Sequence, residues 1–198
     1  ESESRGLGDV YKRQANTSEI TGSYNAATGV LSLTGTATKA QYEAALESVT
    51  YNNSSENPNT SNRTISWIVN DGDANSTAVT STITIAAVND VAVLSDAAGT
   101  LAFTEGDGAT AIDAALTLAD ADDTNIESAT VSISSGFVAA EDVLAIANTS
   151  EITGSYNAAT GVLSLTGTAT KAQYEAALES VTYNNSSENP NTSNRTIS

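Results

Sequence analysis

The acidic residues of this 198-residue chain gather in four short stretches, and their spacing suggests metal binding. The stretches are NDGDAN (70–75), VND (88–90), TEGDG (104–108) and DADD (120–123). Two carboxylates about 4 Å apart repel each other by roughly 1–4 kcal/mol, depending on the effective dielectric constant. Between residues 67 and 146 there are 13 acidic residues and no lysine or arginine, so no base nearby in sequence relieves this repulsion. Ca²⁺ would relieve it, because it binds about six to eight oxygens from carboxylates, amide carbonyls and water.

Of three other interpretations of the acidic stretches, one stays open and two fit poorly. A solvated acidic surface, typical of a protein from salty water, needs no metal at all. An EF-hand fits poorly: Asp71, Asp73 and Asn75 match its loop positions 1, 3 and 5, but Ser76 stands where glycine belongs and Thr82 where glutamate belongs. The glycine-rich nonapeptide of calcium-binding β-rolls is also absent from the sequence.

Composition excludes several other kinds of chemistry. The chain has no histidine and no cysteine, so a Ser/His triad, a thiolate metal site and a disulfide framework are excluded. A net charge of −17 repels nucleic acid and anionic membranes, and no apolar run reaches the roughly 18 residues of a membrane span. We therefore expect neither nucleic-acid binding nor direct membrane insertion. We also expect no enzyme activity, because Asp120 and Asp122 are too close in sequence for a glycosidase pair and suit metal ligation better.

The chain contains a long internal repeat. Residues 15–66 recur without a change at 147–198, an offset of 132 residues, which is typical of a tandem array. Residues 1–14 differ in character, because they hold three of the seven basic residues. When the stretch SRGLGDVYKRQ is written back into codons it resembles a transposon-type sequencing adapter, so we interpret residues 1–14 as a non-native leader.

Alternating apolar and polar residues predict half-buried strands. Leu31 and Leu33 alternate with polar neighbours, as do Ala129, Val131 and Ile133, and the same pattern extends over 63–70 and 77–88. One short helix is expected at TKAQYEAAL, where Thr38 and Gln41 have the spacing of a capping box. We predict an all-β fold of antiparallel Greek-key sandwich repeats in tandem, with one short helix per repeat.

The order of these motifs resembles a cadherin repeat, which has an immunoglobulin-like sandwich. FTEGDGATAI, then LADADD, and then a strand running into WIVNDGDANSTAVTSTITIAAVND are the stretches that carry the resemblance. More narrowly, the chain is similar to the cadherin-like tandem repeats of giant bacterial adhesins of the RTX type, exported by type I secretion. On that resemblance, 15–90 is the C-terminal part of one repeat, and 91–198 is the next repeat, cut before its last strands.

The resemblance implies calcium between successive repeats. Its ligands here would be the residues that match the acidic motifs of the family: Asp71, Asp73, Asn89, Asp90, Glu105, Asp120 and Asp122. The linker departs from the family's D-x-N-D-N-x-P pattern, since Ala87, Val91 and Val93 replace the first Asp, the second Asn and the Pro.

The function implied is that of a structural stalk or adhesion repeat of a large secreted protein on the bacterial cell surface. Its partners would be the neighbouring repeats, together with a host or cell-surface glycan or protein. Two alternatives remain: a glycan-binding or self-binding adhesive module, and a calcium-independent acidic spacer domain of a secreted enzyme. We further expect Trp67 to pack on a sheet that contains Val49 and Tyr51.

Overall fold

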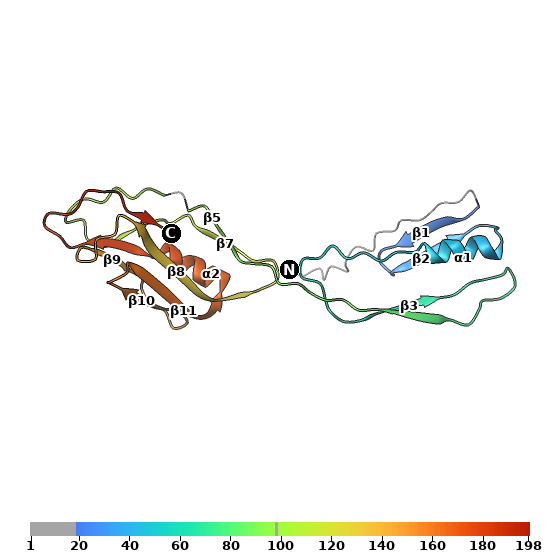
Figure 1. Cartoon of the computed structure of the whole chain (residues 1–198). Coiled ribbons are helices and arrows are strands. Elements are labelled where there is room, and N and C mark those ends of the chain that lie inside the picture. The colour runs from blue at the N-terminus through green and yellow to red at the C-terminus, as the bar shows by residue number, and fades with distance from the viewer. Residues whose placement is uncertain (1–18, 98) are drawn as a thin grey trace. The chain divides into compact units, whose positions relative to one another are not determined.

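The computed structural model describes residues 19–97 and 99–198, and the chain divides into two compact units (Figure 1). The first unit ends at Val88 and the second comprises Asn89–Ser198. The division lies within the VND stretch, two residues before the boundary that the sequence analysis places after residue 90. The leader assigned to residues 1–14 lies outside the described residues.

Over its described residues 19–88, the first unit contains two separate β-hairpins and one helix. Strands β1 (Thr21–Asn25) and β2 (Val30–Thr34) pair antiparallel, and so do β3 (Arg63–Trp67) and β4 (Val79–Ile83). Helix α1 (Lys39–Glu47) lies between the hairpins in sequence.

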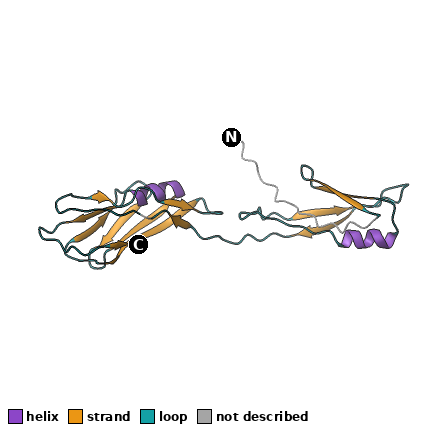
Figure 2. Ribbon diagram, turned by 90° about the horizontal axis from the view of Figure 1, so that it is seen from above, coloured by secondary structure: helices purple, strands orange, loops and turns teal. Residues whose placement is uncertain are grey.

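The second unit contains a four-stranded sheet and a three-stranded sheet, both antiparallel. The first has the order β10-β11-β8-β13 and the second the order β6-β12-β9. A short ladder of β5 and β7 and the helix α2 complete the unit. Figure 2 shows that strands account for most of the regular structure. The bounds are β5 Val93–Ser95, β6 Thr110–Ala111, β7 Thr117–Ala119, β8 Asn125–Ser135, β9 Asp142–Ala145, β10 Thr153–Asn157, β11 Val162–Thr170, α2 Lys171–Glu179, β12 Thr182–Asn185 and β13 Thr196–Ile197.

Both sheets of the second unit contribute to one hydrophobic core. Leu163 and Leu165 from β11 and Ile133 from β8 lie in the same buried cluster as Leu144 from β9 and Tyr183 from β12. Tyr174 of α2 is fully buried in this cluster, and its hydroxyl donates a 2.6 Å hydrogen bond to the Gly167 carbonyl. The helix therefore packs on the sheets through the face that carries Tyr174.

The predicted all-β class and the one short helix per copy are confirmed. Both helices begin with the capping box: the Thr38 and Thr170 hydroxyls accept the backbone N–H groups of Gln41 and Gln173, and each glutamine side chain accepts in return. The capping threonine satisfies N–H groups that the first helical turn leaves without partners, which explains why the helices start there.

Two details of the strand prediction are wrong. The strand expected over 77–88 is shorter, since β4 ends at Ile83, and its first residue, Val79, is 63% exposed. Val49 and Tyr51 lie outside any strand, so Trp67 does not share a sheet with them; its indole N–H donates to the Ser81 hydroxyl at 2.9 Å. In the second copy, residues 182–185 correspond to residues 50–53. They do form a strand, β12, because β6 and β9 pair with them on either side.

Candidate functional site

The DADD stretch forms a tight turn between β7 and β8. The Asp120 carboxylate accepts the backbone N–H of Asp122 at 3.1 Å and that of Asp123 at 2.8 Å. The hydrogen bond from the Asp123 N–H is the largest cause that holds the pKa of Asp120 below its usual value. Burial, the next largest effect, opposes it, and the Asp122 N–H and the charge of Lys171 lower the pKa further. Asp120 is thus an ionised carboxylate that also organises the turn.

Asp122 connects this turn to the first residues of the second unit. One of its carboxylate oxygens, Oδ2, accepts the backbone N–H of Asp90 at 3.1 Å, across 32 positions of sequence. Asn89 lies beside it, and its side-chain amide donates to the Asp90 carbonyl at 2.5 Å. The fold therefore brings two of the expected site segments together, the VND stretch and the D-x-D pair.

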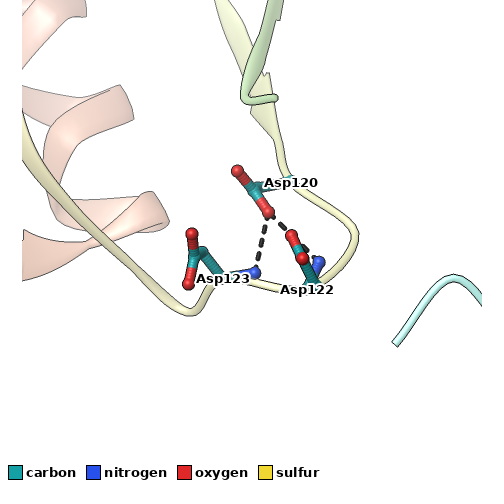
Figure 3. A group of neighbouring side chains, drawn as sticks. All are labelled: Asp120, Asp122 and Asp123. Atoms are coloured by element: carbon teal, nitrogen blue, oxygen red, sulfur yellow. Dashed lines mark hydrogen bonds between the residues drawn. The ribbon is translucent and has the colours of Figure 1, made fainter. Parts of the chain in front are cut away.

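Three carboxylates form a cluster at this turn. Each of Asp120, Asp122 and Asp123 offers an oxygen, and these oxygens all lie within 4.8 Å of one another. Asp120 and Asp122 are half-buried and Asp123 is exposed. Figure 3 shows the three side chains around the turn, with the hydrogen bonds from the Asp122 and Asp123 N–H groups to Asp120. Hard oxygen donors at this spacing have the chemistry that a divalent cation such as Ca²⁺ prefers.

Lys171 lies next to the cluster, which the sequence analysis did not foresee. This first residue of α2 donates through Nζ to the backbone carbonyls of Asp120 and Asp123, each at 2.7 Å. The helix is fixed nearby, because Glu175 accepts the backbone N–H of Leu118 in β7 at 2.8 Å. A base 51 positions away thus offsets part of the repulsion among the carboxylates. No local sequence signal could have revealed it.

The other expected ligands lie elsewhere. Glu105 is exposed in a turn that is closed by a hydrogen bond from the Thr104 N–H to the Asp107 carboxylate. Glu105 does not belong to the carboxylate cluster found among the described residues. Asp71 and Asp73 belong to the loop between β3 and β4 of the first unit. There the Asp71 carboxylate accepts hydrogen bonds from the backbone N–H groups of Ala74 and Asp73. These two bonds, that from Ala74 first, are the main causes that lower the pKa of Asp71.

A second charged group, also missed, lies inside the second unit. Asp142 is 1% exposed and forms a salt bridge with Arg195, with Arg195 Nε 3.1 Å from Oδ2. Its carboxylate also accepts the Tyr183 hydroxyl at 2.6 Å, the Val138 N–H at 2.8 Å and the Asn185 amide at 3.1 Å. Every one of these contacts comes from within the unit and fills the carboxylate's acceptor positions, so this group holds the fold and offers no ligand site.

The chain is similar to part of a much larger protein. It is 46% identical over 86 residues to halomucin of Haloquadratum walsbyi, and the match covers 41% of this chain and 1% of halomucin. No family model matches the chain, and no solved structure matches it.

Within residues 19–97 and 99–198, no helix combines the length and apolar character that a membrane span requires.

Proposed function

We propose that this chain is a segment of a structural tandem-repeat protein located outside the cell, with a mechanical rather than a catalytic role. The observation that carries the proposal is the unchanged 52-residue repeat, which forms the same hairpin and the same capped helix in both copies. Similarity to a small part of halomucin supports the proposal, because the matched segment covers only 1% of halomucin's length, as one repeat of a very long protein would. A surface location accords with the acidic, cysteine-free composition.

We further propose that Ca²⁺ stiffens the start of the second unit. The cation would bind Asp120, Asp122 and Asp123, with water completing its coordination. Because Asp122 also holds the Asp90 backbone, a cation on this turn would rigidify the segment through which the chain enters the unit. Stiff junctions suit a stalk, whose repeats must transmit force end to end.

The test is thermal unfolding of the 198-residue chain in Ca²⁺ and in chelator. A ligand that binds only the folded state adds about 2.7 kcal/mol at 100 times its dissociation constant, so the melting temperature of the second unit should rise with Ca²⁺. Equal melting temperatures in Ca²⁺ and in chelator would refute the site.

The matched control is NaCl at the same ionic strength, because it separates a site from a screened acidic surface. The calcium-independent acidic spacer is the second candidate, and the Lys171 contacts favour it since they already neutralise part of the cluster. Under that alternative NaCl stabilises the chain as much as CaCl₂ does, through screening alone. A response specific to Ca²⁺ supports the proposed site.

A further inference from the structure

Helix α2 begins with a base, although the start of a helix disfavours positive charge. Lys171 is the first residue of α2, where the helix dipole presents its positive end, and the first turn of the helix has no acidic residue. The capping box of Thr170 and Gln173 does not involve the Lys171 side chain. A base at this position therefore has to be stabilised by contacts outside the helix.

Strand pairing places Lys171 directly beside the turn that carries the carboxylate cluster. Thr170, the last residue of β11, pairs with Asn125, the first residue of β8. The Lys171 backbone N–H then donates to the Thr124 carbonyl at 3.3 Å. Because the side chains of a helix lean toward its N-terminus, the Lys171 side chain extends back toward residues 120–123.

The turn is already in contact with one cation, the ammonium group of Lys171. Its Nζ donates to the Asp120 carbonyl and to the Asp123 carbonyl, each at 2.7 Å. Backbone carbonyl oxygens are also ligands that Ca²⁺ uses in proteins. The ammonium and a divalent cation at this turn would therefore compete for oxygens and repel each other.

A second contact of α2 keeps Lys171 within reach of the turn. Glu175 lies one helical turn after Lys171 on the same face of α2. Its carboxylate accepts the backbone N–H of Leu118 in β7, the strand that leads into the turn, at 2.8 Å. Lys171 and Glu175 thus attach one face of the helix both to the turn and to the strand before it.

We propose that Lys171 is a built-in cation of the 120–123 turn and sets the affinity of this turn for Ca²⁺. Without metal, the ammonium group holds the turn, and with it the contact between Asp122 and the Asp90 backbone. When metal binds, the positive charge of Lys171 weakens the binding. The dissociation constant then falls in the range of extracellular calcium modules, about 10⁻⁴–10⁻³ M. This inference rests on the calcium site proposed above.

The repeat supplies a matched control, Lys39. This residue begins α1 with the same sequence and the same capping box as α2. Among the described residues, the Lys39 ammonium has no hydrogen bond or salt bridge, and the carboxylate cluster belongs to the second unit. A neutral residue at position 39 changes the net charge of the chain by the same amount as one at position 171, but it leaves the turn untouched.

Calcium titration calorimetry of the 198-residue chain tests the inference. Lys171→Met removes the charge and keeps the length of the side chain, so it should bind Ca²⁺ at least about tenfold more tightly than the unchanged chain. Lys39→Met should bind with the affinity of the unchanged chain. Lys171→Arg keeps the charge and should also stay near that affinity.

Thermal unfolding in chelator gives a second readout. Lys171→Met should lower the melting temperature of the second unit without metal, and Ca²⁺ should restore it. Lys39→Met should leave the melting temperature of the second unit unchanged. Circular dichroism checks that each variant folds. If the methionine variant is unfolded in chelator, Lys171→Gln, which keeps an N–H donor but no charge, takes its place in both measurements.

The inference and the calcium site fail in different ways. If the unchanged chain binds Ca²⁺ and Lys171→Met binds it no more tightly, the role of Lys171 is wrong and the calcium site stands. Equal tightening by Lys39→Met would also overturn the role of Lys171, because the effect would then come from net charge. If neither the unchanged chain nor Lys171→Met binds Ca²⁺, the calcium site is wrong and the inference falls with it. Binding by Lys171→Met alone would support the inference.

Discussion

Carboxylates in the second unit lie in two different kinds of surroundings. Asp142 is buried, and its acceptor positions are used by Arg195, Tyr183, Asn185 and the Val138 N–H. The cluster at 120–123 is half-buried, and its positive neighbour Lys171 binds backbone carbonyls there. A buried ion pair of the first kind fixes the fold, whereas carboxylates of the second kind are the ligands that we propose for Ca²⁺.

The double variant Asp120→Asn and Asp122→Asn should remove most of the stabilisation by Ca²⁺ and leave the metal-free fold intact. Asparagine keeps an Oδ1 that can accept the N–H groups of the turn, but it carries no charge to attract the cation. Melting temperatures with and without Ca²⁺ measure both effects. A large loss of stability in chelator would instead assign these residues a purely structural role.

Arg195→Met should destabilise the second unit strongly, by about 3–5 kcal/mol, because it leaves the buried Asp142 carboxylate without its ion-pair partner. The repeat supplies the matched control Arg63→Met. Arg63 occupies the same position in the first copy, but there it donates to the Asn59 and Ser61 carbonyls and forms no salt bridge with a described residue. Its replacement should change stability by about 0.5 kcal/mol or less. Equal effects in urea unfolding would contradict the assigned role of Asp142.

The second unit should lose stability in acid through Asp142. Burial alone would raise its pKa, but hydrogen bonds from Arg195, Tyr183 and the Val138 N–H together outweigh burial and hold the pKa below its usual value. A carboxylate with a depressed folded pKa stabilises the fold above its unfolded pKa of about 3.9, and this stability is lost as pH falls through the folded pKa. Urea unfolding from pH 7 to pH 2 should show the loss. Asp142→Asn should flatten that part of the profile.

At the scale of elements, the sequence predicted what depends on near neighbours. The capping box at Thr38 and Gln41 involves residues three apart, so the same helix forms in both copies. The alternation of Leu31 and Leu33 likewise predicted a strand with one buried face. Residues 50–53 could not be assigned in this way, because their copy is a strand only where β6 and β9 pair with it.

The same distinction between near and distant neighbours in sequence applies to the candidate site. Asp120 and Asp122 share a turn, so their proximity was evident from spacing alone. The contribution of Asp90 and Lys171 depends on how β7, β8 and α2 pack, with separations of 32 and 51 positions. Glu105 and the acids of the 70–75 loop have the residue types of a ligand set, but residue type does not determine which turns meet.

Gly161→Ala should cost more stability than Gly29→Ala, although both glycines occupy the same turn of the same sequence. Both variants suffer the strain of a positive φ, of roughly 1 kcal/mol. Only at Gly161 must the Phe137 ring also move, since the new Cβ would lie 2.8 Å from it. Urea unfolding of the two variants gives the difference. If the two alanines cost the same, Phe137 does not pack against this turn as described.

At the scale of the whole molecule, the buried core is unevenly distributed between the units. Of the described hydrophobic residues that are buried, Ile20 and Ala45 belong to the first unit and all the others to the second. Burial of apolar surface is the main favourable contribution to folding. The same repeated residues should therefore be held far less firmly in the first unit than in the second.

We accordingly expect the chain to unfold in two steps, the first unit at lower urea concentration. The chain has a single tryptophan, Trp67, and it lies in β3 of the first unit, so its fluorescence reports that unit alone. Circular dichroism reports the strands of both units. The tryptophan transition should precede the main change in circular dichroism, because few described residues of the first unit are buried. Coincident transitions would mean that the two units unfold as one cooperative structure.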